Sequence, residues 1–197
     1  MFSFLFGSKV KTIKTTRQKE EESEQEYRRT IDEAAKKSIV MDIVNFSDEH
    51  AAYALKVLFK RASAEVCIFT DRSMDKEIFR DRDLVGEAIN FLKMPSARLW
   101  IAYNDPGLKR DLSIVEFLRE INVSSMGNKI EIWDANEAFA GEKFLRSSFF
   151  LNDQLEFRIK TEDEAILNFG NKEFGLRLLF NFFNIVCHSR NMAGKIV

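Results

Sequence analysis

The chain has 197 residues, of which 45% are hydrophobic and 31% are charged, and its formal net charge at pH 7 is −1. This length suits one domain with an appendage, and the balanced charge argues against a protein that binds nucleic acid chiefly through a strongly basic surface. The two cysteines, Cys67 and Cys187, lie in predicted apolar elements without ligand spacing, which favours reduced, buried thiols in a cytoplasmic protein over a zinc site. We expect no cofactor.

The first 37 residues are expected to form a tail and a charged helical arm outside the main domain. The apolar segment from Met1 to Phe6 is too short to cross a membrane, and it precedes its basic residues, unlike a signal peptide. A tail, or a segment docked on a neighbouring chain, is the simpler interpretation, and contact with a membrane surface is the alternative.

Residues 18–37 lack Gly and Pro and predict a solvated helix with one narrow apolar stripe, formed by Tyr27, Ile31 and Ala34. The stripe is too short for a coiled coil, so we expect this arm either to extend outward or to contact a partner chain.

Apolar strands and amphipathic helices alternate from residue 38 onward, in the segment expected to form an α/β domain over residues 38–197. Strands are predicted at residues 38–46, 65–70, 97–103 and 129–133, and helices after Ser47 and at residues 83–93 and 113–121. Ser47 is a typical N-cap, with Asp48 and Glu49 in the first helical turn. The alternation predicts a mixed, mainly parallel sheet with helices on both faces, in which strands 65–70 and 97–103 are adjacent and parallel.

Acidic residues follow three of these strands, at Asp71, Asp105 and Asp134. Because the carboxyl ends of parallel strands carry ligand sites in open α/β sheets, these residues form an alternative site for a divalent metal. Basic residues are interleaved with the acids over residues 71–83, so salt bridges and ordinary turns are the simpler interpretation. No Gly-rich phosphate loop and no Gly-x-Ser-x-Gly elbow is present.

The segment from Arg146 to Val186 predicts a hairpin, a short strand and a long closing helix. Residues 148–151 are apolar, residues 152–154 form a turn signal, and residues 155–160 alternate with the period of a half-buried strand. A further short strand is predicted at residues 165–169, before a helix that is apolar on nearly every side.

This order of elements resembles the C-terminal half of a phospholipase D-like domain. In that family the segment carries His-x-Lys-x-x-x-x-Asp, followed by a strand end rich in small polar residues. With the family's aspartate placed on Asp153, Arg146 stands at the histidine position and Ser148 at the lysine position. Asn168 and Asn171 fall where the small polar residues would be. The frame is therefore similar to the family, while the motif is degenerate.

The resemblance implies a family mechanism in which one histidine attacks phosphorus, a second protonates the leaving group, and lysines hold the phosphate oxygens. Arg146 stays protonated and is not a nucleophile, although its guanidinium can hold a phosphate. The alternative interpretation is that Arg146 is a surface residue at the start of a strand. We therefore expect a non-catalytic binding or assembly module, with Arg146 and Asn171 contacting a phosphate-containing ligand or a partner protein.

The alternative is a phosphodiesterase or nuclease that acts on nucleic acid or phospholipid, dependent on metal through the strand-end carboxylates. The two histidines of the chain, His50 and His188, lie near the start of a helix and the end of the last helix. Neither has a nearby Lys-x-Asp pattern, so a structural role is the simpler interpretation for both, and a histidine near a helix C-terminus, such as His188, is favoured electrostatically whether or not it functions.

Phenylalanine is abundant, with 19 residues, and three lie close together in the last helix. Phe180, Phe182 and Phe183 point in different directions around that helix, so at least one is expected outside the core of the chain. We expect a homodimer, as the resemblance also implies, with Phe180 or Phe183 at the joint and the stripe of Tyr27 and Ile31 docking across it.

Overall fold

The computed structural model describes residues 20–45, 47–71, 78–104, 129–135, 147–160 and 164–191, together with Phe117 and Arg119. In chain order, its helices and strands are α1 (Glu20–Lys37), β1 (Ile43–Asn45), α2 (Asp48–Arg61), β2 (Glu65–Asp71), the short 3-10 helix η2 (Ile78–Arg80), α3 (Arg82–Lys93), β3 (Arg98–Asn104), β4 (Ile130–Asp134), β5 (Ser148–Asn152), β6 (Phe157–Lys160), β7 (Ala165–Asn168), α5 (Lys172–Cys187) and β8 (Arg190–Asn191). None of the helices in these ranges is long and apolar enough to cross a membrane.

The described strands form one open, mixed, eight-stranded sheet in the order β1-β7-β6-β5-β2-β3-β4-β8. The predicted parallel pairing of β2 and β3 is confirmed, in a register that runs from Glu65 opposite Arg98 to Asp71 opposite Asn104. Strand β4 adds to β3 in parallel, whereas the other pairings are antiparallel. The parallel part is therefore smaller than predicted, because the C-terminal hairpin extends one edge and β8 the other.

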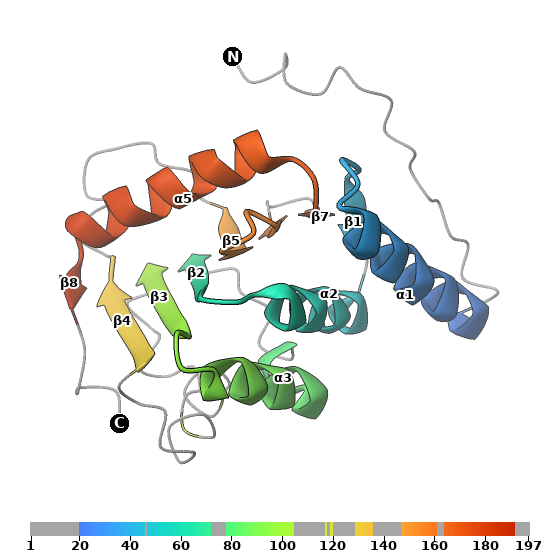
Figure 1. The fold of residues 1–197 in the computed structure, drawn as a ribbon, viewed down its shortest axis with the longest axis horizontal. Coiled ribbons are helices and arrows are strands. Elements are labelled where there is room, and N and C mark those ends of the chain that lie inside the picture. Colours follow the sequence, from blue (N-terminus) through green and yellow to red (C-terminus); the bar gives the residue numbers. More distant parts are fainter. Residues whose placement is uncertain are drawn as a thin grey trace.

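Helices cover both faces of the sheet, as the alternation predicted (Figure 1). Strand β2 shows why, since its side chains alternate between two cores. Val66 and Ile68 belong to the core that includes residues of α1, α2 and α3, while Cys67 and Phe69 belong to the core beneath α5. A central strand of this kind is apolar without interruption because both of its faces are buried.

The second half of α1 is part of the first core. Ile31 is completely buried, Ala34 and Ala35 are almost so, and Tyr27 stacks on the ring of His50 with the centroids 3.7 Å apart. The stripe of Tyr27 and Ile31 was expected to dock across a dimer joint. The structure instead places it against the chain's own α2, because α1 and α2 lie side by side.

Two glycines set close backbone contacts at the ends of β7 and α5. A Cβ on Gly170 would lie 2.5 Å from the carbonyl oxygen of Ser38, a residue with a φ of 47° that follows the last turn of α1. A Cβ on Gly175 would lie 2.3 Å from the carbonyl oxygen of Leu155, in the turn between β5 and β6. Strand β1 is shorter than the predicted strand 38–46 because the chain turns at Ser38 before it joins the sheet.

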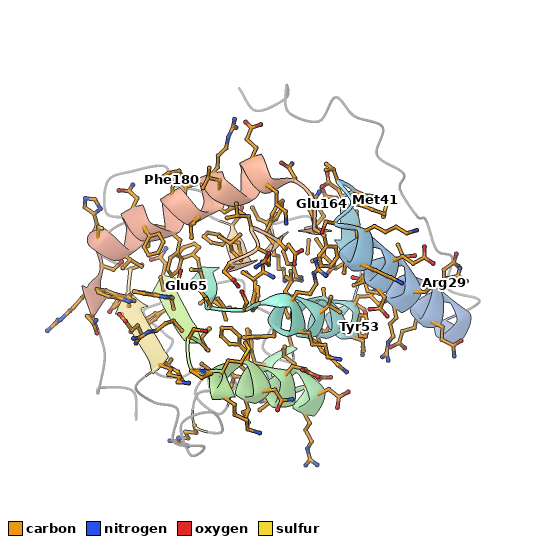
Figure 2. The ribbon with its side chains drawn as sticks, in the orientation of Figure 1. Arg29, Met41, Tyr53, Glu65, Glu164 and Phe180 are labelled. Carbon is orange, nitrogen blue, oxygen red and sulfur yellow. The ribbon has the colours of Figure 1, made fainter. Side chains whose placement is uncertain are left out.

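The outer face of α5 is left uncovered within the described part of the chain. Phe182 is completely buried and Phe183 packs against Trp100, but Phe180 is 69% exposed and Leu176 is 42% exposed. Figure 2 shows Phe180 on the side of α5 that faces away from the sheet. The expectation that at least one of these phenylalanines lies outside the core is confirmed for Phe180.

The cysteines differ in their surroundings. Cys67 is buried, as expected, but Cys187 at the end of α5 is exposed, because only the side of this helix that faces the sheet is covered. The segment from Met1 to Phe6 and the predicted helix 113–121, apart from Phe117 and Arg119, lie outside the described residues.

Candidate functional site

The carboxyl ends of the parallel strands lie at the same edge of the sheet as the start of β5 and the end of β6. Phe69, near the end of β2, pairs with Phe149, and Ser148 pairs with Lys160. Ser148, at the position of the family's motif lysine, therefore lies at the edge where open α/β sheets carry ligand sites.

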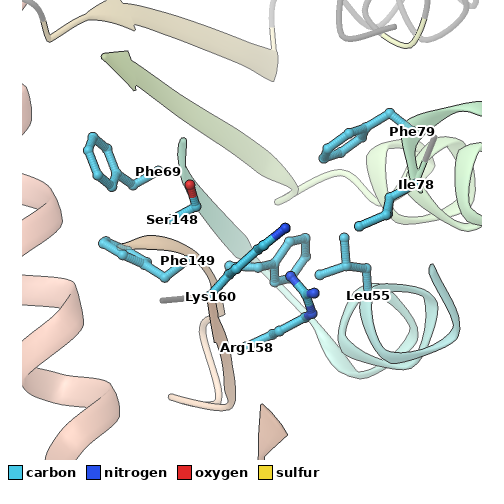
Figure 3. Close-up of a pocket in the computed structure, with 9 residues that line it drawn as sticks. Leu55, Phe69, Ile78, Phe79, Ser148, Phe149, Arg158 and Lys160 are labelled. Atoms are coloured by element: carbon cyan, nitrogen blue, oxygen red, sulfur yellow. The ribbon is translucent and has the colours of Figure 1, made fainter. Parts of the chain in front are cut away.

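A pocket opens at this edge, between the sheet and the helices α2 and η2 (Figure 3). The pocket is small, with a cavity volume of about 20 Å³, and it is open to solvent on one side. The described residues that line it are Leu55, Phe69, Ile78, Phe79, Ser148, Phe149, Phe150, Arg158 and Lys160. The two charged residues among them are both cationic, and Ser148 adds a hydroxyl group.

Arg158 and Lys160 extend from β6 towards α2 and η2, because residues two apart on a strand point to the same face. Arg158 is 9% exposed, and its Nε donates a hydrogen bond of 3.0 Å to Oδ1 of Asn45 on β1. The Nδ2 of Asn45 in turn donates to the carbonyl oxygen of Ile43 at 3.1 Å. A neutral amide thus helps to orient the guanidinium, which also has a further interaction in the structure.

The charge of Arg158 reaches the phenol of Tyr27. Burial raises the pKa of this phenol well above its usual value, while the positive charge of Arg158 acts in the opposite direction. Leu55 of α2 lines the pocket and α2 also packs against α1, so the pocket lies near the packing of these two helices.

Asp153, the motif aspartate, lies at the opposite end of β5 from Ser148. Its Oδ1 accepts a hydrogen bond of 2.8 Å from the backbone N–H of Ser63, and its Oδ2 accepts one from the Ser63 hydroxyl. Burial alone would raise the pKa of Asp153, but hydrogen bonds from Ser63, Ala64 and Gln154 hold it below its usual value. The carboxylate therefore ties the β5–β6 turn to the loop before β2.

Asn168 and Asn171 also lie at the end of the sheet away from the pocket, since Asn168 pairs with Phe157 at the start of β6. The Oδ1 of Asn168 accepts hydrogen bonds from the backbone of Gly170 at 2.9 Å and of Asn171 at 2.8 Å, and its Nδ2 donates to Asp42 at 2.7 Å. Asn171 is the N-cap of α5 and accepts from the N–H of Phe174 at 3.1 Å. Both residues organise the turn into the last helix.

The structure therefore separates the predicted motif residues. Ser148 lines the pocket, while Asp153, Asn168 and Asn171 lie at the other end of the sheet, and Arg146 lies outside the described residues. Glu156 lies at that other end and is completely buried, and its carboxylate accepts the Nε–H of Arg61 at 2.8 and 3.0 Å and the Nδ2 of Asn152 at 3.1 Å.

The strand-end carboxylates fall at one edge by backbone register, because Asp71 pairs with Asn104 and Tyr103 pairs with Asp134. Burial and the neighbouring Asp134 raise the pKa of Tyr103 to about 12. Asp105 lies outside the described residues. Within the described ranges, no three His, Cys, Asp or Glu side chains are grouped so as to hold a metal ion.

The two histidines are on helices that cover opposite faces of the sheet. His50 lies in the first turn of α2, and burial lowers the pKa of its imidazole. His188 is exposed at the end of α5, with Nδ1 2.8 Å from the carbonyl oxygen of Asn184. The structure therefore does not bring them together as a catalytic pair.

Sequence reasoning missed Arg158 and Lys160 as site residues. They alternate with Phe157 and Ile159, and this pattern predicts a strand with its charged face in solvent. In the structure α2 packs against β6, and Arg158 and Lys160 extend towards that helix instead of into solvent. The available signal was two cations on one face of a strand, close to the position of the missing motif lysine.

Neither a family model nor a curated protein matches this sequence. Among solved structures, one similar fold is that of TrmBL2, an archaeal chromatin protein whose structure shows a novel mode of DNA binding. The TM-score is 0.53 at 14% identity, and the match covers 88% of this chain and 65% of the length of the TrmBL2 chain.

Another similar fold is that of Nuc from Salmonella typhimurium, a phospholipase D family member. Its TM-score is 0.53 at 12% identity, with 78% of this chain and 98% of that chain covered. Identities this low establish the fold alone, and the chain accordingly has a phospholipase D-like α/β fold.

Proposed function

We propose that this chain is a phospholipase D-like module that binds a phosphate-containing ligand and does not hydrolyse it. The observation that carries the proposal is the pocket at the carboxyl edge of the sheet, with Arg158, Lys160 and Ser148 in its wall. Guanidinium, ammonium and hydroxyl groups are the side-chain donors that bind phosphate oxygens most readily.

The absence of hydrolysis follows from the chemistry of the motif positions. Arginine at position 146 and serine at position 148 replace the histidine and lysine that the resemblance implies. A protonated guanidinium cannot attack phosphorus, and His50 and His188 belong to helices on opposite faces of the sheet, so they are not placed to act as the nucleophile and the acid of the family mechanism. The chain can therefore bind a phosphate group although it lacks the residues that would cleave the phosphodiester.

The phosphate can come from nucleic acid or from a phospholipid head group. TrmBL2 is an archaeal chromatin protein with a novel mode of DNA binding, and Nuc is a phospholipase D family member. Because the net charge of the chain is −1, attraction to either polyanion would come from the local pocket and not from the whole surface.

The test combines binding with turnover. The purified chain is mixed with single- and double-stranded DNA and with vesicles that contain phosphatidic acid, and hydrolysis of these and of a generic phosphodiester is followed with and without EDTA. We expect binding to at least one of these probes and no turnover. Metal-independent turnover contradicts the non-catalytic assignment, and EDTA-sensitive turnover favours the alternative with Asp71 and Asp134 at the strand ends.

We also propose that two copies pair through the outer face of α5, where Leu176 and Phe180 are exposed one turn apart. The two side chains lie at i and i+4, so they form a single apolar contact surface. A second copy of the chain is the proposed occupant because an isologous two-fold contact needs only this one surface.

A further inference from the structure

We infer that Lys160 supplies, from the neighbouring strand, the cationic contact to phosphate that is missing at position 148. The inference rests on the proposed phosphate-binding function and names the residues that would carry it. Lys160 would act together with Arg158 and the hydroxyl of Ser148, and the ligand group would be a phosphate monoester or diester with at least two unesterified oxygens.

The register of the β5–β6 hairpin places Lys160 next to position 148. Ser148 and Lys160 are directly opposite each other in the antiparallel pair of β5 and β6. Side chains opposite one another in such a pair have Cβ atoms about 5 Å apart and point to the same face of the sheet. A lysine at position 160 can therefore bring its ammonium group towards the space that a lysine at position 148 would fill, and serine at position 148 is the smaller side chain.

The second step is the arrangement of the two cations. Arg158 lies two residues before Lys160 on the same face and is fixed by its hydrogen bond of 3.0 Å to Asn45. This bond uses one of the five N–H donors that a guanidinium carries in a planar fork, and Arg158 also takes part in a further interaction. The rigid Arg158 and the longer, partly exposed Lys160 thus provide one oriented and one adjustable contact to a phosphate group.

The apolar walls of the pocket strengthen these contacts. Leu55, Ile78 and Phe79 face the two cations from α2 and η2 (Figure 3), and both Ile78 and Phe79 are buried. Charge-assisted hydrogen bonds are stronger where water is excluded. Because Ser148, Arg158 and Lys160 each have a further interaction in the structure, an incoming phosphate must compete with it, and we expect a modest affinity.

The experiment measures the binding of inorganic phosphate and of a short 5′-phosphorylated oligonucleotide, by calorimetry or NMR titration of the full chain. Lys160 is partly exposed, so Lys160→Gln should fold, and we expect it to weaken phosphate binding about tenfold or more. Lys160→Arg should retain most of the affinity. Lys93→Gln removes the same charge from an exposed position on α3 and should change nothing.

A charge swap tests the positional replacement directly. In the double variant Ser148→Lys with Lys160→Ser, the cation moves back to β5, and we expect phosphate affinity within a few-fold of the wild type. If the swap variant folds but binds phosphate as weakly as Lys160→Gln, the inference that Lys160 takes the place of a lysine at position 148 is wrong. If the swap variant does not fold because position 148 is buried, the contrast between the Gln and Arg variants at position 160 decides.

The failures of the two proposals are distinguishable. If the wild type binds phosphate and Lys160→Gln binds it equally well, the inference about Lys160 is wrong while the proposed function stands. If the wild type binds neither phosphate nor the phosphorylated oligonucleotide, the proposed function itself is wrong.

Discussion

At the scale of single residues, the protonation state of the His50 imidazole affects the packing of α1 on α2. Its ring stacks on Tyr27 with an interplanar angle of 11°, and its Nδ1 is buried without a hydrogen-bond partner among the described residues. Burial is the main cause that lowers the pKa of His50, Arg28 adds to it, and Glu24 and Glu49 oppose it. The folded chain therefore prefers the neutral imidazole.

This preference predicts how stability depends on pH. Since the pKa of His50 in the folded chain lies below its usual value of 6.5, the contribution of the neutral imidazole to stability is present above that pH and is lost as the pH falls through the folded pKa. We expect the urea midpoint of the wild type to fall over this window. Replacing His50 with Phe keeps a ring for Tyr27 and should flatten this part of the profile. An unchanged slope in the variant would assign the pH dependence to other groups.

At the scale of secondary-structure elements, local rules predicted which helices and strands form better than they predicted which of them lie next to each other. Ser47 does accept the hydrogen bond of an N-cap, from His50 N–H at 3.1 Å, because capping depends only on residues a few positions away. The period-two pattern of β6 was also correct. The groups that cover the charged face of this strand, α2 and Asn45 of β1, are about 100 residues away in sequence, so the burial of Arg158 could not be predicted from the local pattern.

Gly175 shows how tertiary contact reverses an elementary helix preference. Alanine is favoured over glycine inside a helix by about 1 kcal/mol, so a Gly→Ala change usually stabilises. At Gly175 the added Cβ would lie 2.3 Å from the carbonyl oxygen of Leu155, and α5 would have to move from the β5–β6 turn. We expect Gly175→Ala to lower the free energy of unfolding by about 1–3 kcal/mol.

Gly86 in α3 is the matched control, because a Cβ there would meet no atom within 4 Å. Gly86→Ala should leave stability unchanged or raise it by up to about 1 kcal/mol. Urea unfolding of both variants checks the pair. Equal effects at the two positions would mean that the approach of α5 to the turn is not tight.

At the scale of the whole molecule, the sheet separates a structural end from a candidate binding end. Ser148 and Asp153 are five residues apart, and a strand rises about 3.3 Å per residue, so the two motif positions lie at opposite ends of β5. The motif frame predicted that both residues belong to one hairpin. It did not predict Lys160, because the pairing of β5 with β6 becomes visible only once the register is known.

The outer face of α5 predicts the behaviour of the whole chain in solution. Phe180 is 69% exposed on a helix whose other face is packed on the sheet, so Phe180→Glu should leave the fold intact. If two copies pair here, the charge should weaken their association about tenfold or more, since a central aromatic residue often dominates an interface.

Val40, 68% exposed beside α1, gives the matched control Val40→Glu. Light scattering across a dilution series checks the prediction. A wild type that stays monomeric at the highest concentration, or equal effects of the two substitutions, contradicts pairing through this face. A shift with Phe180→Glu alone assigns the interface to α5, because both variants add the same charge to equally exposed positions.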